Sequence, residues 1–483
     1  MGRGALIMSN IFLSTSLIYL ASEEAGCLDD ELTVVEDCNT RVYGMLPVAL
    51  IANIAVVSGL LSAFLMPLTG AAVDYTPHRR KIGMYSAALV ILIQAIQIGT
   101  LPKTWFAMSV LQGFSGFLFQ VQVLATYAYF PVIARAVGEA TMTHCEYFNL
   151  QVDDDACLLY ANLTTSFFPR IYIVSASFTM VQFSSQALFL VVVIALSLAI
   201  GLNDVQTGQL SQGLNACFSG LAFYIGWRIL PSAPATHELP ANKTLFTQSF
   251  TQVWQTTKSM NNNYGKSLRW FFLGLIFAES ASNAFTLVAV IFLNDQLGMT
   301  GTEIGIFFLV TLVATLPGSR IGAIITSRTN PNISWRLSMA FLMTTAIAGA
   351  FILDKGMNIV AYVWGVVIGL GLGWFYPVEN LVFSMLLPKG QEAELSGFYV
   401  YCTQILGWLP PLIFSIMVEN SIHQKYGILV VTSFFAVAIA LLSMLRWTEA
   451  LEEVRGSEDT SIKKEKDVED YPVEPHGSVL QVE

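Results

Sequence analysis

Twelve long apolar segments constrain the fold of this chain more than any other feature of its sequence. Each is long enough to cross the hydrocarbon core of a bilayer as an α-helix, which takes roughly 17–25 residues. Hydrophobic residues make up 54% of the chain and charged residues only 12%, well below the roughly one quarter of charged residues in soluble domains. The sequence therefore predicts a polytopic membrane protein. The segments are residues 4–21, 45–73, 82–100, 105–130, 172–201, 210–230, 268–293, 303–327, 337–353, 359–387, 395–418 and 428–445.

A polar stretch rich in proline, threonine and asparagine divides these segments into two sets of six. We expect an amino-terminal six-helix bundle over residues 1–231, a cytosolic linker over 232–266 and a carboxy-terminal six-helix bundle over 267–447. Residues 448–483 mix acidic and basic side chains with little apolar content, which predicts a disordered cytosolic tail. The predicted fold is all-α, with two pseudo-symmetric bundles of the kind found in transporters built from repeats.

The distribution of lysine and arginine predicts the orientation, because cytosolic loops carry an excess of both. If both termini lie in the cytosol, then among the 24 basic residues only Arg41, Lys103, Lys355 and Lys425 lie on the opposite side. We therefore expect both termini in the cytosol. Loop 132–170 then falls on the cytosolic side, although its acidic run and its cysteines would suit the opposite face, so its side stays open.

The ends of the chain and its cysteines add little chemistry. Segment 4–21 lacks a small-residue cleavage site, so we interpret it as a first span or signal anchor; it is short, and residues upstream of it could be missing. Cys27 and Cys38 share the first outer loop, where an oxidising compartment would permit a disulfide, and the sequence leaves open whether they are bridged.

No metal site or other cofactor is expected. No phosphate-binding glycine loop ends in Lys-Ser or Lys-Thr, so neither direct ATP drive nor an enzyme is indicated.

Two acidic residues lie inside apolar segments, where a carboxylate at the helix centre costs roughly 2.5–3.5 kcal/mol on insertion scales. Glu279 lies in segment 268–293 and Glu379 in segment 359–387. Such acids usually line a polar path through the membrane. Glu279 could bind a substrate amine or, because desolvation favours the neutral acid, carry a coupling proton near neutral pH; a carboxyl group satisfied by hydrogen bonds between helices is the alternative. Glu379 and Asn380 fit a binding site and a gate near the inner surface equally well.

Polar neighbours in these segments extend the candidate substrate or proton site. Asn283 lies four residues after Glu279, so the two side chains can share a helix face, and Ser282 lies beside them. In the fourth segment, Gln112 and Gln120 are eight residues apart and also share a face. Hydrogen bonding between helices would explain these glutamines as well as ligand contact.

The loop between the second and third segments carries a candidate gate, Gly70-Ala-Ala-Val-Asp74-Tyr-Thr-Pro-His-Arg79-Arg80-Lys81. Gly70 would let a neighbouring helix approach closely. Asp74 can engage a helix N-terminus or a basic partner across the two halves, while Arg79 and Arg80 can anchor to anionic headgroups. This pattern resembles the loop signature of the major facilitator superfamily, with one extra residue between the acid and the first arginine. A basic loop that only sets topology is the alternative.

A more specific resemblance lies around the eleventh segment. The stretch Leu387-Pro388-Lys389-Gly390-Gln-Glu392-Ala-Glu394-Leu-Ser-Gly397-Phe398-Tyr399 precedes Gly407-Trp408-Leu409-Pro410-Pro411-Leu412. It resembles the vacuole effluxer family, the autophagy-related vacuolar amino-acid exporters and their bacterial relatives. That family has a proline-glycine turn, a Glu-x-Glu pair, a small-aromatic-Tyr start to span eleven and then Ser-Trp-Leu-Gly-Pro. The run Tyr127-Ala-Tyr129-Phe130-Pro131-Val-Ile-Ala134 is similar to its Asn-Ala-Tyr-Leu-Pro-Glu-Ile-Ala at the end of span four.

The chain departs from the family pattern at positions that would meet a substrate. Tyr127 stands where the family has Asn, and Val132 where it has Glu. Glu379 and Asn380 occupy a place where it usually has a Ser-Arg pair, whereas Glu279 falls close to its span-seven Asp and keeps the charge. An acid and an amide in place of a cation would change which substrate group this part of the site meets.

The resemblance implies an alternating-access secondary transporter that moves small solutes, amino acids among them, from a vacuole or lysosome-like compartment to the cytosol. It implies a monomer whose partners are a small solute and the lipid bilayer, with protons as the candidate coupling ion and without nucleic acid. A carrier of another small metabolite at a different membrane is one alternative. A non-transporting receptor or scaffold with the same fold is another.

Overall fold

Helices make up nearly all the regular structure in the parts of the chain that the computed structural model describes. Those parts are residues 2–28, 40–129, 167–230, 239, 244–263, 267–387, 392–420, 422–423 and 425–452. Several sequence predictions fall outside them: Cys38, nearly all of loop 132–170, and the tail from residue 453. Cys27 is disulfide-bonded.

The amino-terminal half and the linker supply one set of helices. They are α1 (Gly2–Glu24), the short η1 (Pro47–Ala49), α2 (Leu50–Tyr75), α3 (Arg79–Gln97), α4 (Trp105–Tyr127), α7 (Phe167–Ile200), α8 (Asp204–Ile229) and the linker helix α9 (Leu245–Asn263). The carboxy-terminal half supplies α10 (Ser267–Ile291), its π-helical extension η2 (Phe292–Gln296), α11 (Gly301–Arg328), α12 (Pro331–Ile352), α13 (Asn358–Met385), α14 (Glu392–Ile405), α15 (Leu409–Glu419) and α16 (Lys425–Ser443).

Ten helices among the described residues are, by length and composition, long and apolar enough to cross a bilayer. Two further helices, α3 and α8, match predicted segments but are more polar. The polar residues of α8 make hydrogen bonds to neighbouring helices. Gln212 donates to the Ser9 carbonyl of α1 (3.1 Å), and Asn215 donates to Gln94 of α3 (2.9 Å). These polar side chains are buried between helices, so they lower the hydropathy of α8 without facing lipid.

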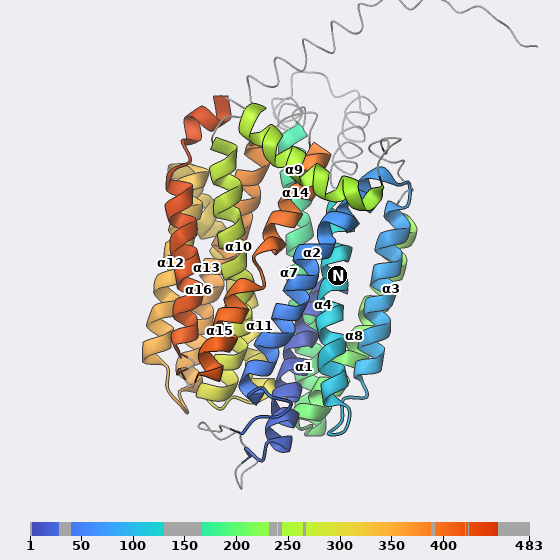
Figure 1. Cartoon of the computed structure of the whole chain (residues 1–483). Coiled ribbons are helices and arrows are strands. Elements are labelled where there is room, and N and C mark those ends of the chain that lie inside the picture. The colour runs from blue at the N-terminus through green and yellow to red at the C-terminus, as the bar shows by residue number, and fades with distance from the viewer. Residues whose placement is uncertain are drawn as a thin grey trace, which may run out of the picture.

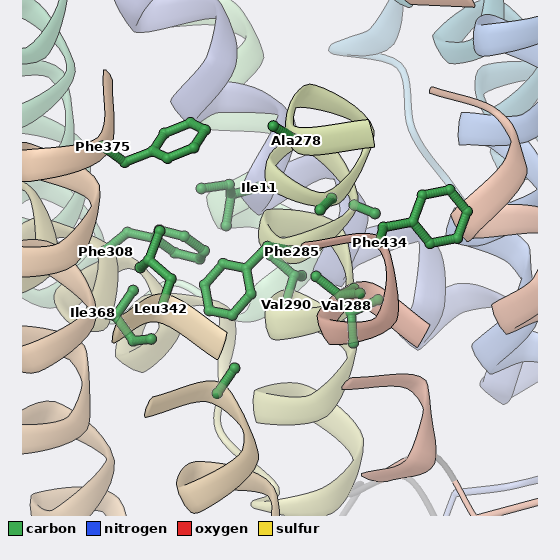
Figure 2. Close-up of a cluster of buried hydrophobic side chains, with 14 of the residues drawn as sticks. Ile11, Ala278, Phe285, Val288, Val290, Phe308, Leu342, Ile368, Phe375 and Phe434 are labelled. Carbon is green, nitrogen blue, oxygen red and sulfur yellow. The ribbon is translucent and has the colours of Figure 1, made fainter. Parts of the chain in front are cut away.

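The helices form an all-α membrane fold of two bundles (Figure 1). In the first, α1 packs against α7 and α8, while α3 and α4 pack together beside α2. In the second, α13 packs against α11 and α12, and α16 packs against α10 and α12. The apolar core continues from one bundle to the other: Ile11 of α1 lies in the same buried cluster as Phe285 of α10 and Phe308 of α11 (Figure 2).

Small residues bring α11 and α13 close together. A Cβ atom at Gly369 or Gly373 of α13 would collide with the backbone carbonyl oxygens of Thr311 and Thr315 in α11. Glycines four residues apart recur on one helix face, and they let two backbones approach as in other membrane helix pairs. The α11–α13 pair is therefore closely packed along much of its length within the second bundle.

Span eleven is broken where α14 ends and α15 begins. Residues 406–408 form a turn, and Pro410 and Pro411 follow in the first turn of α15. Proline has no backbone N–H group, so the helical hydrogen-bond ladder cannot run through this point. Gly59 of α2 lies against the backbone of Trp408 at the break, where any side chain at Gly59 would collide. The break is thus packed directly against the other bundle.

The two ends of the molecule differ. The linker helix α9 crosses one end, which we call the α9 end (Figure 1). At the opposite end, hydrogen bonds join the two halves. Asp204 Oδ1 accepts from the Gly301 N–H at 3.0 Å, and the hydroxyls of Ser197 and Thr302 are 3.3 Å apart. Nearby, the Arg41 guanidinium lies 3.1 Å from the Glu419 carboxylate.

Candidate substrate cavity

A cavity of about 390 Å³ lies between the two halves, a size typical of small-molecule sites. Seven helices line it: α1, α4 and α7 from the first bundle and α10, α11, α13 and α14 from the second. Its polar side chains include Arg3, Gln120, Gln182 and Gln186 from the first half and Glu279, Ser282, Asn283, Glu379, Asn380, Thr403 and Gln404 from the second.

Two acids form the centre of the carboxy-terminal wall. Glu279 of α10 is 9% exposed and Glu379 of α13 is 2% exposed, and their carboxyl groups are close enough to interact. The Tyr399 hydroxyl of α14 donates a hydrogen bond to Glu379 Oε1. Because like charges repel strongly where water is excluded, such a pair binds one proton or one cationic group readily.

The remaining predicted residues of this wall are held by hydrogen bonds around Tyr376. The hydroxyls of Ser282 and Tyr376 are 2.7 Å apart, and the Asn380 side-chain amide donates to the Tyr376 carbonyl at 3.1 Å. Asn283 also lines the cavity. The structure therefore places Glu379 and Asn380 with Glu279 in the lining of one cavity, and a gating role for Glu379 and Asn380 stays a prediction.

Arg3 lines the same cavity from the amino-terminal half, and sequence reasoning missed it. Its guanidinium carbon lies 5.4 Å from the Phe119 ring centroid and 6.0 Å from that of Tyr127, within the range of cation–π attraction. The start of α1 lies at about mid-height in the bundle (Figure 1), so this cation lies deep in the protein. A basic residue beside the start of an apolar segment usually lies at the membrane surface. Nothing in the sequence reveals that Arg3 lies deep in the protein instead.

The two glutamines predicted on α4 have different surroundings. Gln120 lines the cavity. Gln112 instead accepts a hydrogen bond from the Gln97 amide of α3 at 3.0 Å, and it is not part of the cavity lining. Two turns of helix separate them, so a shared face does not give them the same neighbours.

The predicted gate residues lie at the α9 end. Gly70 and Asp74 line a smaller cavity of about 50 Å³ under α9, and Tyr127 lines both this cavity and the central one. Asp74 Oδ2 accepts from the Gln252 amide of α9 at 3.3 Å. The linker helix, rather than the opposite bundle, thus supplies this partner of Asp74.

The two arginines of the loop hold helix ends of the first bundle together. Arg79 donates to the Ala128 carbonyl at 3.0 Å, and Arg80 donates to the carbonyls of Trp227 at 2.8 Å and Arg228 at 3.1 Å. These carbonyls follow α4 or end α8, where backbone acceptors lack helical partners and cations are favoured. Among the described residues, no group of three or more His, Cys, Asp or Glu side chains is arranged to hold a metal ion.

The amino-acid sequence of the chain matches a known protein family and a named relative. The family model described as "Vacuole effluxer Atg22 like" matches residues 5–455. The chain is also 22% identical over 186 residues to "Autophagy-related protein 22" of Yarrowia lipolytica (strain CLIB 122 / E 150), an alignment that covers 37% of this chain. The alignment spans about a third of that relative's length, 32%.

Solved structures of transporters share the fold. The chain is similar to the xylose transporter XylE from E. coli in a partially occluded inward-open conformation, with a TM-score of 0.56, 11% identity and coverage of 92% of this chain and 96% of the other. It is also similar to a bacterial homologue of the iron transporter ferroportin in an inward-facing state, with a TM-score of 0.50, 13% identity and coverage of 91% and 98%. With a family match that runs through nearly all its spans, this membrane protein of the major facilitator fold belongs to the family described as "Vacuole effluxer Atg22 like".

Proposed function

We propose that this protein is a secondary active transporter that carries amino acids out of a vacuole or lysosome-like compartment by alternating access. The observation that carries the proposal is the charge arrangement of the cavity. Arg3 lines it from one half, and the acid pair Glu279 and Glu379 lines it from the other. A zwitterionic amino acid presents a carboxylate and an ammonium group, so it can satisfy both sides at once.

Each side suits the group it would bind. The guanidinium of Arg3 can hold a carboxylate through two parallel hydrogen bonds. The acid pair can accept an ammonium group while one of its carboxyls stays protonated. With one proton on the pair, the loaded site is electrically neutral, which favours its passage through a low-dielectric protein. Proton and amino acid would then move together.

Binding between the halves also explains how a substrate could drive closure. A ligand shifts a conformational equilibrium only by its different affinity for the two states. An amino acid held by Arg3 of α1 and by Glu279 of α10 binds best when the two bundles approach, so it favours an occluded state. The family and the basic loops support a topology in which the α9 end faces the cytosol and the Asp204 end faces the lumen.

Transport into proteoliposomes tests the proposal directly. The purified protein would be assayed with a panel of radiolabelled amino acids, with a pH gradient imposed and removed. We expect Glu279→Gln to lower uptake at least about tenfold and to reduce its pH dependence. A hydrogen bond to a charged group contributes more than about 1.4 kcal/mol to binding, and that energy corresponds to about a tenfold change in affinity. Glu449→Gln, at an exposed ion pair with Arg446, is the matched control.

The outcomes separate the alternatives. Full uptake with unchanged pH dependence in Glu279→Gln would reject the role of the acid pair. Saturable flux of another metabolite, without competition by amino acids, would point to a different carrier. Absence of flux for every solute, together with a stable protein partner, would favour a receptor or scaffold.

A further inference from the structure

The linker helix α9 exposes its large aromatic residues, whereas several of its polar residues are buried. Three of its polar residues face the protein: Gln248, Ser249 and Thr256 are buried, while Thr247, Gln255 and Thr257 are exposed. Its large aromatic residues face outward, with exposed fractions of 64% for Phe246, 44% for Phe250 and 70% for Trp254. In water this would leave a contiguous aromatic surface uncovered, which soluble proteins avoid unless it meets a partner.

Helical spacing and hydrogen bonds fix this orientation. Phe246, Phe250 and Trp254 are four residues apart, so they share one face, and the first two rings pack edge to face with centroids 5.5 Å apart. On the other face, Gln248 donates to the Tyr75 hydroxyl at 2.8 Å, and Gln252 donates to Asp74 at 3.3 Å. These two bonds hold α9 against α2 with the aromatic face outward.

The position of α9 indicates what covers that face. The helix contacts α2, α10 and α14 and crosses the end of the bundle where these helices terminate (Figure 1). It therefore lies at the level where membrane spans meet the headgroups. The adjoining helix α2 exposes Phe64 and Leu65 within its span, roughly 15 Å from Asp74 along the helix axis, so exposed apolar surface of a span ends within about 15 Å of α9.

We propose that α9 is an interfacial helix that inserts Phe246, Phe250 and Trp254 into the headgroup–acyl boundary of the adjacent leaflet. Aromatic residues concentrate at this depth in membrane proteins, and amphipathic helices lie there with their apolar face down. Lys258 is exposed four residues beyond Trp254 on the same face, which suits anionic phospholipid headgroups. The partner is thus the phospholipid bilayer, and the inference does not depend on which solute is carried.

Quenching of tryptophan fluorescence in the full-length protein tests this inference. The signal of Trp254 is obtained as the difference between wild type and Trp254→Phe in vesicles that contain anionic lipid. We expect lipids brominated near the headgroup to lower this signal roughly twofold or more, with a weaker effect of lipids brominated near the chain end, because the rings of interfacial helices lie about 5–10 Å deep. Aqueous iodide should have little effect.

Two further measurements make the result decisive. The difference signal of Trp335, which is fully buried within the second bundle, serves as the control and should respond to neither quencher. Quenching of Trp254 by iodide but not by brominated lipid would overturn the proposal, because the face would lie in water. Protection from both quenchers would also overturn it, since protein would then cover the face. Lys258→Gln should reduce the effect of anionic lipid on quenching and leave the depth unchanged.

Discussion

At the residue scale, Tyr399 holds one of the two cavity acids. Its hydroxyl donates to Glu379, and its ring stacks on Phe383 with centroids 4.2 Å apart. Because hydrogen bonds to charged groups contribute roughly 1.5–3 kcal/mol, we expect Tyr399→Phe to raise the substrate KM about tenfold in proteoliposomes. Tyr426→Phe, at an exposed position of α16, is the control. An unchanged KM would mean that the hydroxyl does not position the acid.

Arg3 should decide whether the cavity requires a carboxylate on its substrate. We expect the wild-type protein to prefer an amino acid over the corresponding amine, which lacks that group, and Arg3→Gln to lose most of this preference. Arg3→Lys keeps the positive charge but loses the planar guanidinium group, so this variant should retain only part of the preference for the amino acid. Competition of each amine with a radiolabelled amino acid measures the ratio. A preference that survives Arg3→Gln would place carboxylate recognition elsewhere.

The sequence could predict the acids of the site but not its geometry. Glu279 and Glu379 were identifiable because a carboxyl group in an apolar segment is costly. Gln112 and Gln120 looked equivalent, since helical periodicity gives a face and not a depth, yet only Gln120 reaches the cavity. Arg3 gave no signal, because the depth at which α1 begins depends on how the helices pack together.

At the scale of single helices, the α11–α13 contact depends on its glycines. A Cβ at Gly369 would collide with the Thr311 carbonyl oxygen, whereas one at Gly226 in α8 meets nothing. We expect Gly369→Ala to lower the free energy of unfolding by roughly 1–3 kcal/mol through overpacking. Gly226→Ala should be neutral or slightly stabilising, as alanine is favoured over glycine in helices. Thermal unfolding of the purified variants compares them, and equal losses in both would contradict the close contact.

Most helices could be predicted from the sequence, because hydrophobicity dominates in a bilayer. The exceptions have physical reasons. The linker helix α9 was hidden among polar residues, although Phe246, Phe250 and Trp254 at four-residue spacing were a usable signal. The break in span eleven follows from Pro410 and Pro411, but hydropathy alone joins α14 and α15 into one segment.

At the scale of the whole molecule, the contacts opposite α9 should respond to pH. Asp204 lies outside the apolar part of α8, and its carboxylate accepts from the Gly301 N–H of the other half. Burial raises the pKa of Asp204 above its ordinary value; the Gly301 hydrogen bond opposes this shift, and Glu303 adds to it. Tyr19 and Glu23 of α1 are also charged or titratable groups nearby. The closed end thus binds a proton more tightly than an open, hydrated Asp204 would.

The sign of the pH effect follows from this difference. As pH falls through the range between the ordinary and the raised pKa, proton uptake favours the closed form. Spin labels placed across this end should report a larger closed population in acid. Asp204→Asn, whose carbonyl can still accept from Gly301, should remove most of the response. A response that persists in Asp204→Asn would assign it to other groups.

The contact between Gly59 of α2 and Trp408 at the break in span eleven has a consequence for how the two bundles move relative to each other. Because Gly59 has no side chain, α2 lies directly against the Cβ and backbone of Trp408. Such a contact can act as a pivot, where distances change little while the two ends of the cavity open and close. A short covalent tether across this point should leave turnover intact. The same tether between residues 204 and 301 should keep the end opposite α9 closed and stop turnover.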